Sequence, residues 1–244
     1  MLARVPGTTL SFGGPLTPMV RRLLWANGLV FLLEVILLKI SAGGGSSGYD
    51  VLVGIFGLTP RNVIGRGWVW QLGTYMFLHE VSTLWHIGLN MLTLWMFGGD
   101  LERLWGGTGF LRYYLICGVG AGLTVLAIAH ASGVPTIGAS GALFGILLAY
   151  GMQFPDRILL ISFVLPVRAR WFVLFMGLIT LYYILAAPRA GISDLAHLGG
   201  LVFGWLYLKR AWRVRQLVAE MRWHWRRRRF RVYGGDDRRG PRVH

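Results

Sequence analysis

Charged residues and cysteine are scarce in this sequence. Charged side chains make up 14% of its 244 residues, against about 25% in ordinary soluble domains. Together with a mean hydropathy of +0.54, this scarcity excludes an ordinary soluble domain. The single cysteine, Cys117, excludes an internal disulfide framework. The chain therefore folds without disulfide bonds, and its core has to form in lipid.

Metal-binding and paired-acid motifs are also missing. His79-Glu80 begins like the zinc motif H-E-x-x-H, but the position three residues after Glu80 is a threonine. The aspartates Asp100, Asp156 and Asp194 all lie at the edges of apolar runs, so catalysis by paired aspartates within a membrane is not expected. We predict no metal and no cofactor.

The positive charge is concentrated at the C-terminal end. A net charge of +15 would favour nucleic acid binding in a soluble chain. Eleven arginines, however, follow residue 212, in a tail that contains Arg226–Arg229 with Trp223, Trp225 and Phe230 nearby. Basic residues directly after a spanning helix are typical of cytoplasmic ends and attract anionic lipid headgroups. We predict a basic cytoplasmic tail over 212–244 that contacts membrane lipids, with RNA binding as the alternative.

Six hydrophobic runs reach the roughly 17–20 residues that a helix needs to cross about 30 Å of hydrocarbon. They are residues 22–40, 84–103, 111–130, 138–154, 171–187 and 193–210. Glu34 lies in the first run and is costly in lipid, so we expect it to face protein or a neighbour such as Lys39. The sequence predicts an all-α integral membrane protein with six transmembrane helices over 21–211, after a cytoplasmic segment at 1–20.

The long connection over 41–83 is apolar but interrupted. The interruptions are Gly54, Gly57, Pro60, Gly65 and Gly67. These residues argue against a spanning helix, while Trp68, Trp70 and Tyr75 favour the membrane interface. We predict a half-embedded first loop that contains short helices.

Loop charges predict the orientation. Residues 103–112 and 155–170 carry arginines, whereas residues 131–137 carry no charge. Positively charged loops lie inside, which puts both termini in the cytoplasm. The expected location is the cell inner membrane, with several spans crossing it, and a membrane of an organelle of bacterial ancestry is the alternative.

This orientation brings three polar side chains to one side of the membrane. His86, Ser140 and His197 each lie three to four residues into a run that enters from the outer side. At 1.5 Å per residue, all three lie within roughly 10 Å of the outer surface.

Ser140 and His197 are the candidates for a nucleophile and its general base. Ser140 opens an apolar run, where the free N–H groups of a helix N-terminus can bind an oxyanion. His197 is an ionisable group in an apolar helix, which is a candidate functional residue. The alternatives are a serine that caps its helix and a histidine that hydrogen-bonds to a neighbouring helix.

Glycines directly behind both residues favour the catalytic interpretation. Gly141 and Gly145 are four residues apart, as are Gly200 and Gly204, and small residues at this spacing let helix backbones approach closely. Packing these faces together would bring the Ser140 hydroxyl within hydrogen-bond distance of the histidine imidazole.

Other residues complete the candidate site. His86 and Asn90 share one helix face and suit an oxyanion hole together with the Ser140 N–H, although contacts between helices would also explain them. Phe144 lies one turn after the serine and can pack on the imidazole ring. Asp194 is expected at the surface, so we predict a Ser–His dyad without an acidic third member.

These motifs, in this order, resemble the rhomboid intramembrane serine proteases, most closely the compact six-helix bacterial type. The matching tracts are His86-Ile87-Gly88-Leu89-Asn90, Gly138-Ala139-Ser140-Gly141 and Ala196-His197-Leu198-Gly199-Gly200, with Gly204 behind them. Gly99, Glu102 and Arg103 are similar to the family's turn at the inner end of the second span. The resemblance covers roughly residues 20–210.

The resemblance implies cleavage of single-pass membrane proteins near the outer face, at small residues beside an unstable helical segment. Ser140 would be the nucleophile and His197 the general base and then acid. His86, Asn90 and the Ser140 N–H would stabilise the oxyanion. Two departures concern the first loop: the family often has Trp-Arg where this chain has Trp70-Gln71, and the interval from His79 to His86 is longer.

A non-catalytic rhomboid-like protein that binds or escorts membrane clients is the alternative function. Such a protein would be expected to lack the serine or the histidine, and this chain has both. A small transporter would carry polar groups near the midplane between repeated halves, and the sequence has no internal repeat.

Overall fold

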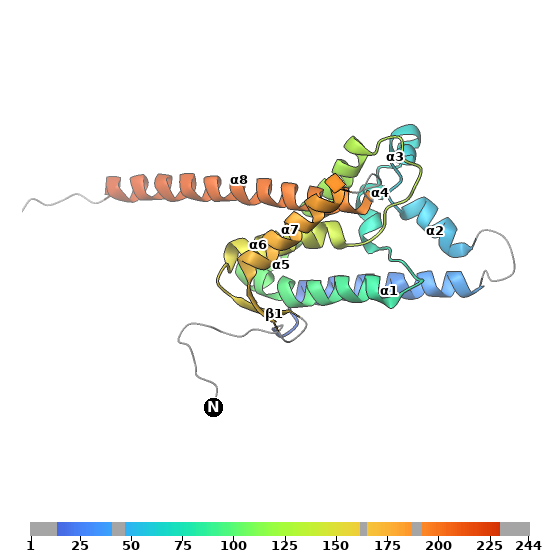
Figure 1. The fold of residues 1–244 in the computed structure, drawn as a ribbon. Coiled ribbons are helices and arrows are strands. Elements are labelled where there is room, and N and C mark those ends of the chain that lie inside the picture. Colours follow the sequence, from blue (N-terminus) through green and yellow to red (C-terminus); the bar gives the residue numbers. More distant parts are fainter. Residues whose placement is uncertain (1–13, 41–46, 162–164, 187–191, 230–244) are drawn as a thin grey trace, which may run out of the picture. The chain divides into compact units, whose positions relative to one another are not determined.

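The computed structural model describes residues 14–40, 47–161, 165–186 and 192–229 (Figure 1). Both ends of the chain, which carry parts of the predicted cytoplasmic segments, lie outside these residues. The chain divides into two units, Met1–Tyr207 and Leu208–His244. The described elements are α1 (Pro18–Ile40), α2 (Gly48–Phe56), α3 (Pro60–Arg66), α4 (Gln71–Thr74), the 3-10 helix η1 (Tyr75–Phe77), α5 (Leu84–Ile128), α6 (Ser140–Gln153), β1 (Ile158–Ile161), β2 (Leu165–Arg168), α7 (Ala169–Ala186) and α8 (Ile192–Arg229).

Three of the described helices, α1, α5 and α7, are long and apolar enough to cross a membrane. Helix α5 covers both the second and the third predicted runs and breaks at Gly106, whose φ of 74° and ψ of 161° are not helical. The seven-residue connection predicted between these runs, residues 104–110, is therefore reduced to a break at one glycine. Glycine adopts this positive φ without the steric cost that other residues meet.

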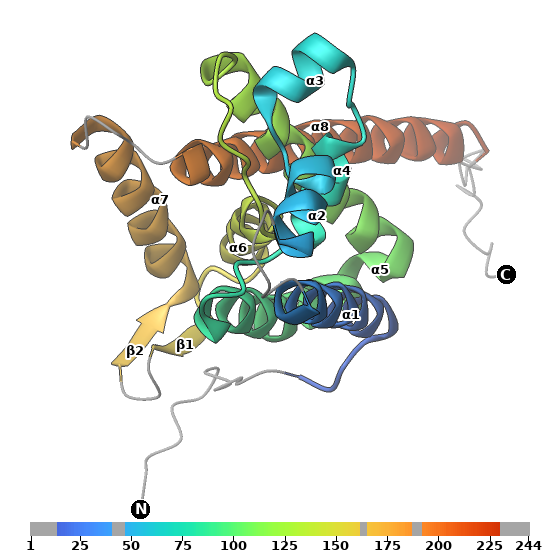
Figure 2. The ribbon, with the colours of Figure 1, turned by 90° about the vertical axis from the view of Figure 1, so that its right-hand side faces the viewer.

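Helix α6 is shorter than predicted. It begins at Ser140 and ends at Gln153, so its 14 residues extend about 21 Å, whereas the predicted run began at residue 138. Gly138 has a φ of 115°, which no right-handed helix contains. The helix therefore begins two residues later, and Ser140 is its first helical residue. In the first unit, α6 lies in the middle, next to α5, α7 and the first part of α8 (Figure 2).

A small β-hairpin interrupts the helical fold. Strands β1 and β2 pair antiparallel, with Ile158 opposite Arg168 and Ile161 opposite Leu165. At the base of the hairpin, the Oδ1 atom of Asp156 lies 3.6 Å from Nη1 of Arg168 and 3.5 Å from Nη1 of Arg170. The sequence analysis used the arginines of this segment only to assign the orientation and did not predict the hairpin, which is a small addition to a mostly helical fold.

Glu102 fixes the start of α1 against α5. Its buried carboxylate accepts the backbone N–H groups of Met19 at 2.9 Å and Val20 at 2.8 Å, and also the Thr17 hydroxyl. The first N–H groups of a helix have no partner within the helix, and a negative charge there is favourable. The Glu102 side chain thus accepts free N–H groups at the start of α1 and holds this end of the helix beside α5.

Gln71 holds the first loop together. The residue is fully buried; its Oε1 accepts the Thr59 N–H at 3.0 Å, and its Nε2 donates to the carbonyls of Gly54 and Ile55. Glutamine at this position therefore joins the end of α2 to the start of α3. The predicted short helices are present. Tyr75, which we expected at the membrane interface, is instead buried and donates to the Gly118 carbonyl at 2.8 Å.

The backbones of α6 and α8 touch at their glycines. A Cβ added to Gly200 would overlap the carbonyl oxygen of Gly141, and a Cβ added to Gly204 would lie 3.3 Å from the Cα of Gly145. On the other side of α6, a Cβ added to Gly141 would lie 2.6 Å from the Cβ of Ala121 in α5. Glycine is therefore required by the space between three helices.

This packing makes Gly200→Ala a severe substitution. Overpacking of a tight interior typically costs about 1–3 kcal/mol and sometimes more, and here the obstacle is backbone that cannot rotate away. We expect a lower melting temperature in detergent than for the wild-type protein. Gly28→Ala in α1 is the matched control, because a Cβ there meets nothing within 4 Å, and it should leave the melting temperature unchanged or slightly raised. Equal melting temperatures for the two variants would contradict the packing.

Candidate active site

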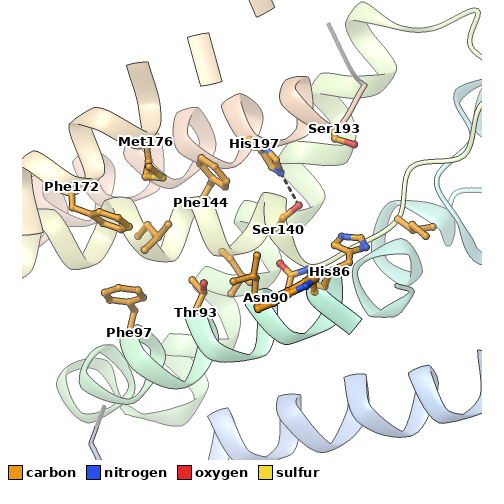
Figure 3. A pocket seen from close by; sticks show the side chains of 15 residues that line it. His86, Asn90, Thr93, Phe97, Ser140, Phe144, Phe172, Met176, Ser193 and His197 are labelled. Carbon is orange, nitrogen blue, oxygen red and sulfur yellow. Dashed lines mark hydrogen bonds between the residues drawn. The ribbon is translucent and has the colours of Figure 1, made fainter. Parts of the chain in front are cut away.

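Ser140 and His197 form a hydrogen bond between α6 and α8. The Ser140 Oγ lies 2.8 Å from the Nε2 atom of His197 (Figure 3). Ser140 is the first residue of α6, and His197 lies in the second turn of α8. A hydroxyl at hydrogen-bond distance from an imidazole is the arrangement in which a base can take the proton of a nucleophile.

The His197 ring is held by its neighbours. The ring of Phe144 stacks on it, with 4.2 Å between centroids and 10° between planes. On the other side of the imidazole, Nδ1 lies 3.9 Å from Asp194 Oδ1, which is beyond direct hydrogen-bond distance. Asp194 was expected at the surface, but its side chain is 27% exposed. The stacked ring and the nearby carboxylate limit the orientations open to the imidazole.

His86 presents one particular ring nitrogen to the site. The backbone N–H of Glu80 donates to its Nδ1 at 3.1 Å, so Nδ1 is unprotonated and a neutral ring carries its proton on Nε2. A Cβ built on Gly138 would lie only 2.8 Å from that Nε2. Because Gly138 has no Cβ, the Nε2–H of His86 fits beside the backbone two residues before α6.

Asn90 lies one turn after His86 and is buried. Its Nδ2 donates to the His86 carbonyl at 2.9 Å and lies 3.9 Å from the Cβ position of Gly138. Because an amide nitrogen has two hydrogens, one N–H remains for a further acceptor.

These residues line the polar end of a cavity of about 580 Å³. Phe97 in α5, Leu147 in α6, and Phe172 and Met176 in α7 form its apolar part (Figure 3). Cavities of this size, mainly apolar with a few convergent polar groups, are typical of binding and active sites. An extended apolar chain could therefore lie in the cavity with its backbone near Ser140.

The sequence analysis missed His79 and Glu80 as neighbours of the site. The His79 ring contacts the His86 ring, with centroids 5.2 Å apart, and burial, with the nearby His86, lowers the pKa of His79 to about 4. The sequence analysis considered His79-Glu80 as a fragment of a zinc motif, and His79 also as one end of the longer interval to His86. Within the described ranges, no group of three or more histidine, cysteine, aspartate or glutamate side chains could hold a metal ion.

Comparisons with known proteins agree on one family. The Rhomboid domain profile matches residues 66–213. The chain is 37% identical over 151 residues to "Rhomboid protein 1, mitochondrial" from Saccharomyces cerevisiae, which covers 60% of this chain and 42% of that protein. It is 35% identical over 119 residues to "Rhomboid protease GluP" from Bacillus subtilis, covering 49% of this chain and 21% of that protein.

A third relative is human, "Presenilin-associated rhomboid-like protein, mitochondrial". It is 30% identical over 155 residues, which cover 58% of this chain and 39% of that protein. The chain thus spans less than half the length of the relatives it matches. Because the Rhomboid domain profile nevertheless covers more than half of this chain, the protein belongs to the rhomboid family.

Proposed function

We propose that this protein is an intramembrane serine protease with Ser140 as the nucleophile and His197 as its base. The observation that carries the proposal is the 2.8 Å hydrogen bond between Ser140 Oγ and His197 Nε2 in the wall of an apolar cavity. Membership of a family that includes a named rhomboid protease supports it. The hydrogen bond also argues against the alternative of a non-catalytic escort protein, which needs no such pair.

The geometry suggests the following steps. His197 Nε2 takes the hydroxyl proton while Ser140 Oγ attacks a peptide carbonyl carbon, and the carbonyl oxygen becomes an oxyanion. The backbone N–H of Ser140, the Nε2–H of His86 and the free N–H of Asn90 stabilise that charge. His197 then gives its proton to the leaving amine, and a water molecule activated by the same imidazole hydrolyses the acyl-enzyme.

The membrane arrangement belongs to the same proposal. The 45 residues of α5 extend about 68 Å, more than twice the thickness of the hydrocarbon core. Broken at Gly106, α5 would provide two spans, which with α1, α6, α7 and the start of α8 makes six. Both termini would lie in the cytoplasm and the protein in the cell inner membrane. Substrates would be single-pass transmembrane proteins, cleaved near the outer face.

Loss of either dyad member should abolish cleavage. We expect Ser140→Ala and His197→Ala, purified in detergent, to fold like the wild-type protein but to leave a fluorescent single-span substrate intact. A fluorophosphonate should modify the wild-type protein at Ser140, as identified by mass spectrometry. Ser132→Ala is the matched control and should cleave normally: this partly exposed loop serine does not line the cavity, and its hydroxyl accepts the Val134 N–H. Normal cleavage by Ser140→Ala would contradict the proposal.

The oxyanion donors should affect turnover more than binding. Removing one donor typically costs about 10²–10³-fold in kcat, so we expect His86→Ala and Asn90→Ala to lower kcat by amounts of this order. KM should change little, because these groups act on the transition state. Steady-state kinetics in detergent separate the two constants. A rise in KM at unchanged kcat would assign both residues to substrate binding instead.

The basic tail is proposed to bind anionic lipid headgroups. Helix α8 continues to Arg229, so Arg226–Arg229 are its last four residues. Each basic residue near an anionic membrane surface contributes about 1 kcal/mol of attraction. Four adjacent arginines at the end of a helix therefore favour contact with such a surface.

Limited trypsin digestion tests this contact. In nanodiscs that contain phosphatidylserine, cleavage after Arg226–Arg229 should be slower than in nanodiscs of neutral lipid. About 1 M salt should remove the difference, because it shortens the Debye length to about 3 Å. Replacing the four arginines by glutamine should make cleavage at the remaining tail sites less sensitive to lipid charge, because fewer basic residues are left to attract the surface. Equal rates in the two lipids would contradict lipid binding by the tail.

A further inference from the structure

Helix α1 carries a buried carboxyl group, that of Glu34. Glu34 is fully buried, and both of its oxygens accept the backbone N–H of His79, at 3.0 and 3.1 Å. As expected, it faces protein. Ionisable residues inside spanning helices are costly and usually functional. The partner of Glu34 is a backbone N–H in the segment that leads into α5.

The next peptide group in that segment contacts the candidate active site. The Glu80 N–H donates to Nδ1 of His86, while the preceding N–H, that of His79, points to Glu34. The His79 carbonyl accepts the hydroxyl of Tyr49 at 3.4 Å. The consecutive backbone N–H groups of His79 and Glu80 thus connect Glu34 in α1 to the His86 ring, which would donate to the oxyanion.

We infer that Glu34 is a positioning residue for the oxyanion donor. It holds the His79–Glu80 segment so that the Glu80 N–H keeps the His86 proton on Nε2, the nitrogen beside Gly138. The inference rests on the proposed function, in which His86 Nε2–H stabilises the oxyanion. Without an acceptor at position 34 the buried His79 N–H would lose its partner, and buried N–H groups are strongly driven to find one. The segment would then shift and release His86 Nδ1.

A released His86 ring would populate its other tautomer. With the proton on Nδ1, the Nε2 atom presents a lone pair to the cavity, which repels an oxyanion. Glu34 would therefore act on catalysis through His86, without contacting the substrate.

The tautomer can be observed directly. In protein labelled with ¹⁵N-histidine, the signals of His86 are identified by their loss in His86→Gln. We expect the wild-type protein and Glu34→Gln, which keeps a carbonyl acceptor, to show a protonated Nε2 and an unprotonated Nδ1. Glu34→Ala should show a mixture of tautomers. A proton on Nδ1 in the wild-type protein, or an unchanged spectrum in Glu34→Ala, would overturn the inference.

Kinetics provide the second readout. We expect Glu34→Ala to lower kcat by on the order of tenfold, a fraction of the loss caused by removing a donor outright, with KM unchanged and with rescue by Glu34→Gln. Glu102→Ala is the matched control: it removes the other buried glutamate bound near α1 and should lower the melting temperature without changing the His86 signals. Altered His86 signals in that control, or a failure of Glu34→Gln to rescue kcat, would reduce Glu34 to a structural role.

The two proposals fail separately. If the wild-type protein cleaved no substrate and reacted with no fluorophosphonate, the proposed protease function would be wrong, while the spectra would still report whether Glu34 controls the His86 tautomer. If the wild-type protein cleaved normally and His86 kept its tautomer in Glu34→Ala, only the inference on Glu34 would be overturned.

Discussion

The backbone contact between α6 and α8 is the constraint on which the site depends. A membrane provides no hydrophobic driving force between helices, so they associate through close packing and hydrogen bonds. Here Gly200 lies against the Gly141 carbonyl, where no other residue would fit. That contact lies one residue after Ser140 and three residues after His197. The serine and histidine meet because the glycines behind them remove the side chains that would keep their helices apart.

Polar side chains complete the fold by satisfying backbone groups that lipid cannot. Within the described residues, the Glu102 carboxylate accepts hydrogen bonds from N–H groups at the start of α1. Gln71 joins α2 to α3 through hydrogen bonds to their backbones, and the Tyr113 hydroxyl donates to the Gly145 carbonyl at 2.7 Å. In a medium without water, each unsatisfied backbone group costs several kcal/mol. Glu102 and Gln71 therefore fix the ends of helices, and Tyr113 ties α5 to the middle of α6.

Local patterns predicted most of the helices and the candidate site residues. Each of the six hydrophobic runs overlaps a helix over most of its length in the described structure, because an apolar run of this length is a property of the local sequence. The pairing of Ser140 with His197 was also accessible, since two glycine pairs marked the faces that pack. The rhomboid resemblance rested on the same residues, and the family profile bears it out.

Most features that the sequence analysis missed depend on contacts between residues, and one depends on a backbone angle. The hairpin depends on pairing Ile158 with Arg168, and the burial of Tyr75 depends on Gly118 in α5. Nothing in the local sequence marks the Glu80 N–H as the partner of His86, because any residue except proline provides that group. Helix α6 is short because of the backbone at Gly138, which hydropathy does not report. Sequence patterns identified the candidate site residues and the packing of Phe144 on His197, but the hydrogen-bond partner of His86 required three-dimensional positions.

The most direct test of the account is an experimental structure of the protein after reaction with a fluorophosphonate. We predict a phosphorus atom bonded to Ser140 Oγ, with its oxygen about 3 Å from the Ser140 N–H and from Nε2 of His86, and with the His197 ring still stacked on Phe144. A phosphonyl oxygen turned away from His86, or a reacted residue other than Ser140, would contradict the site described above.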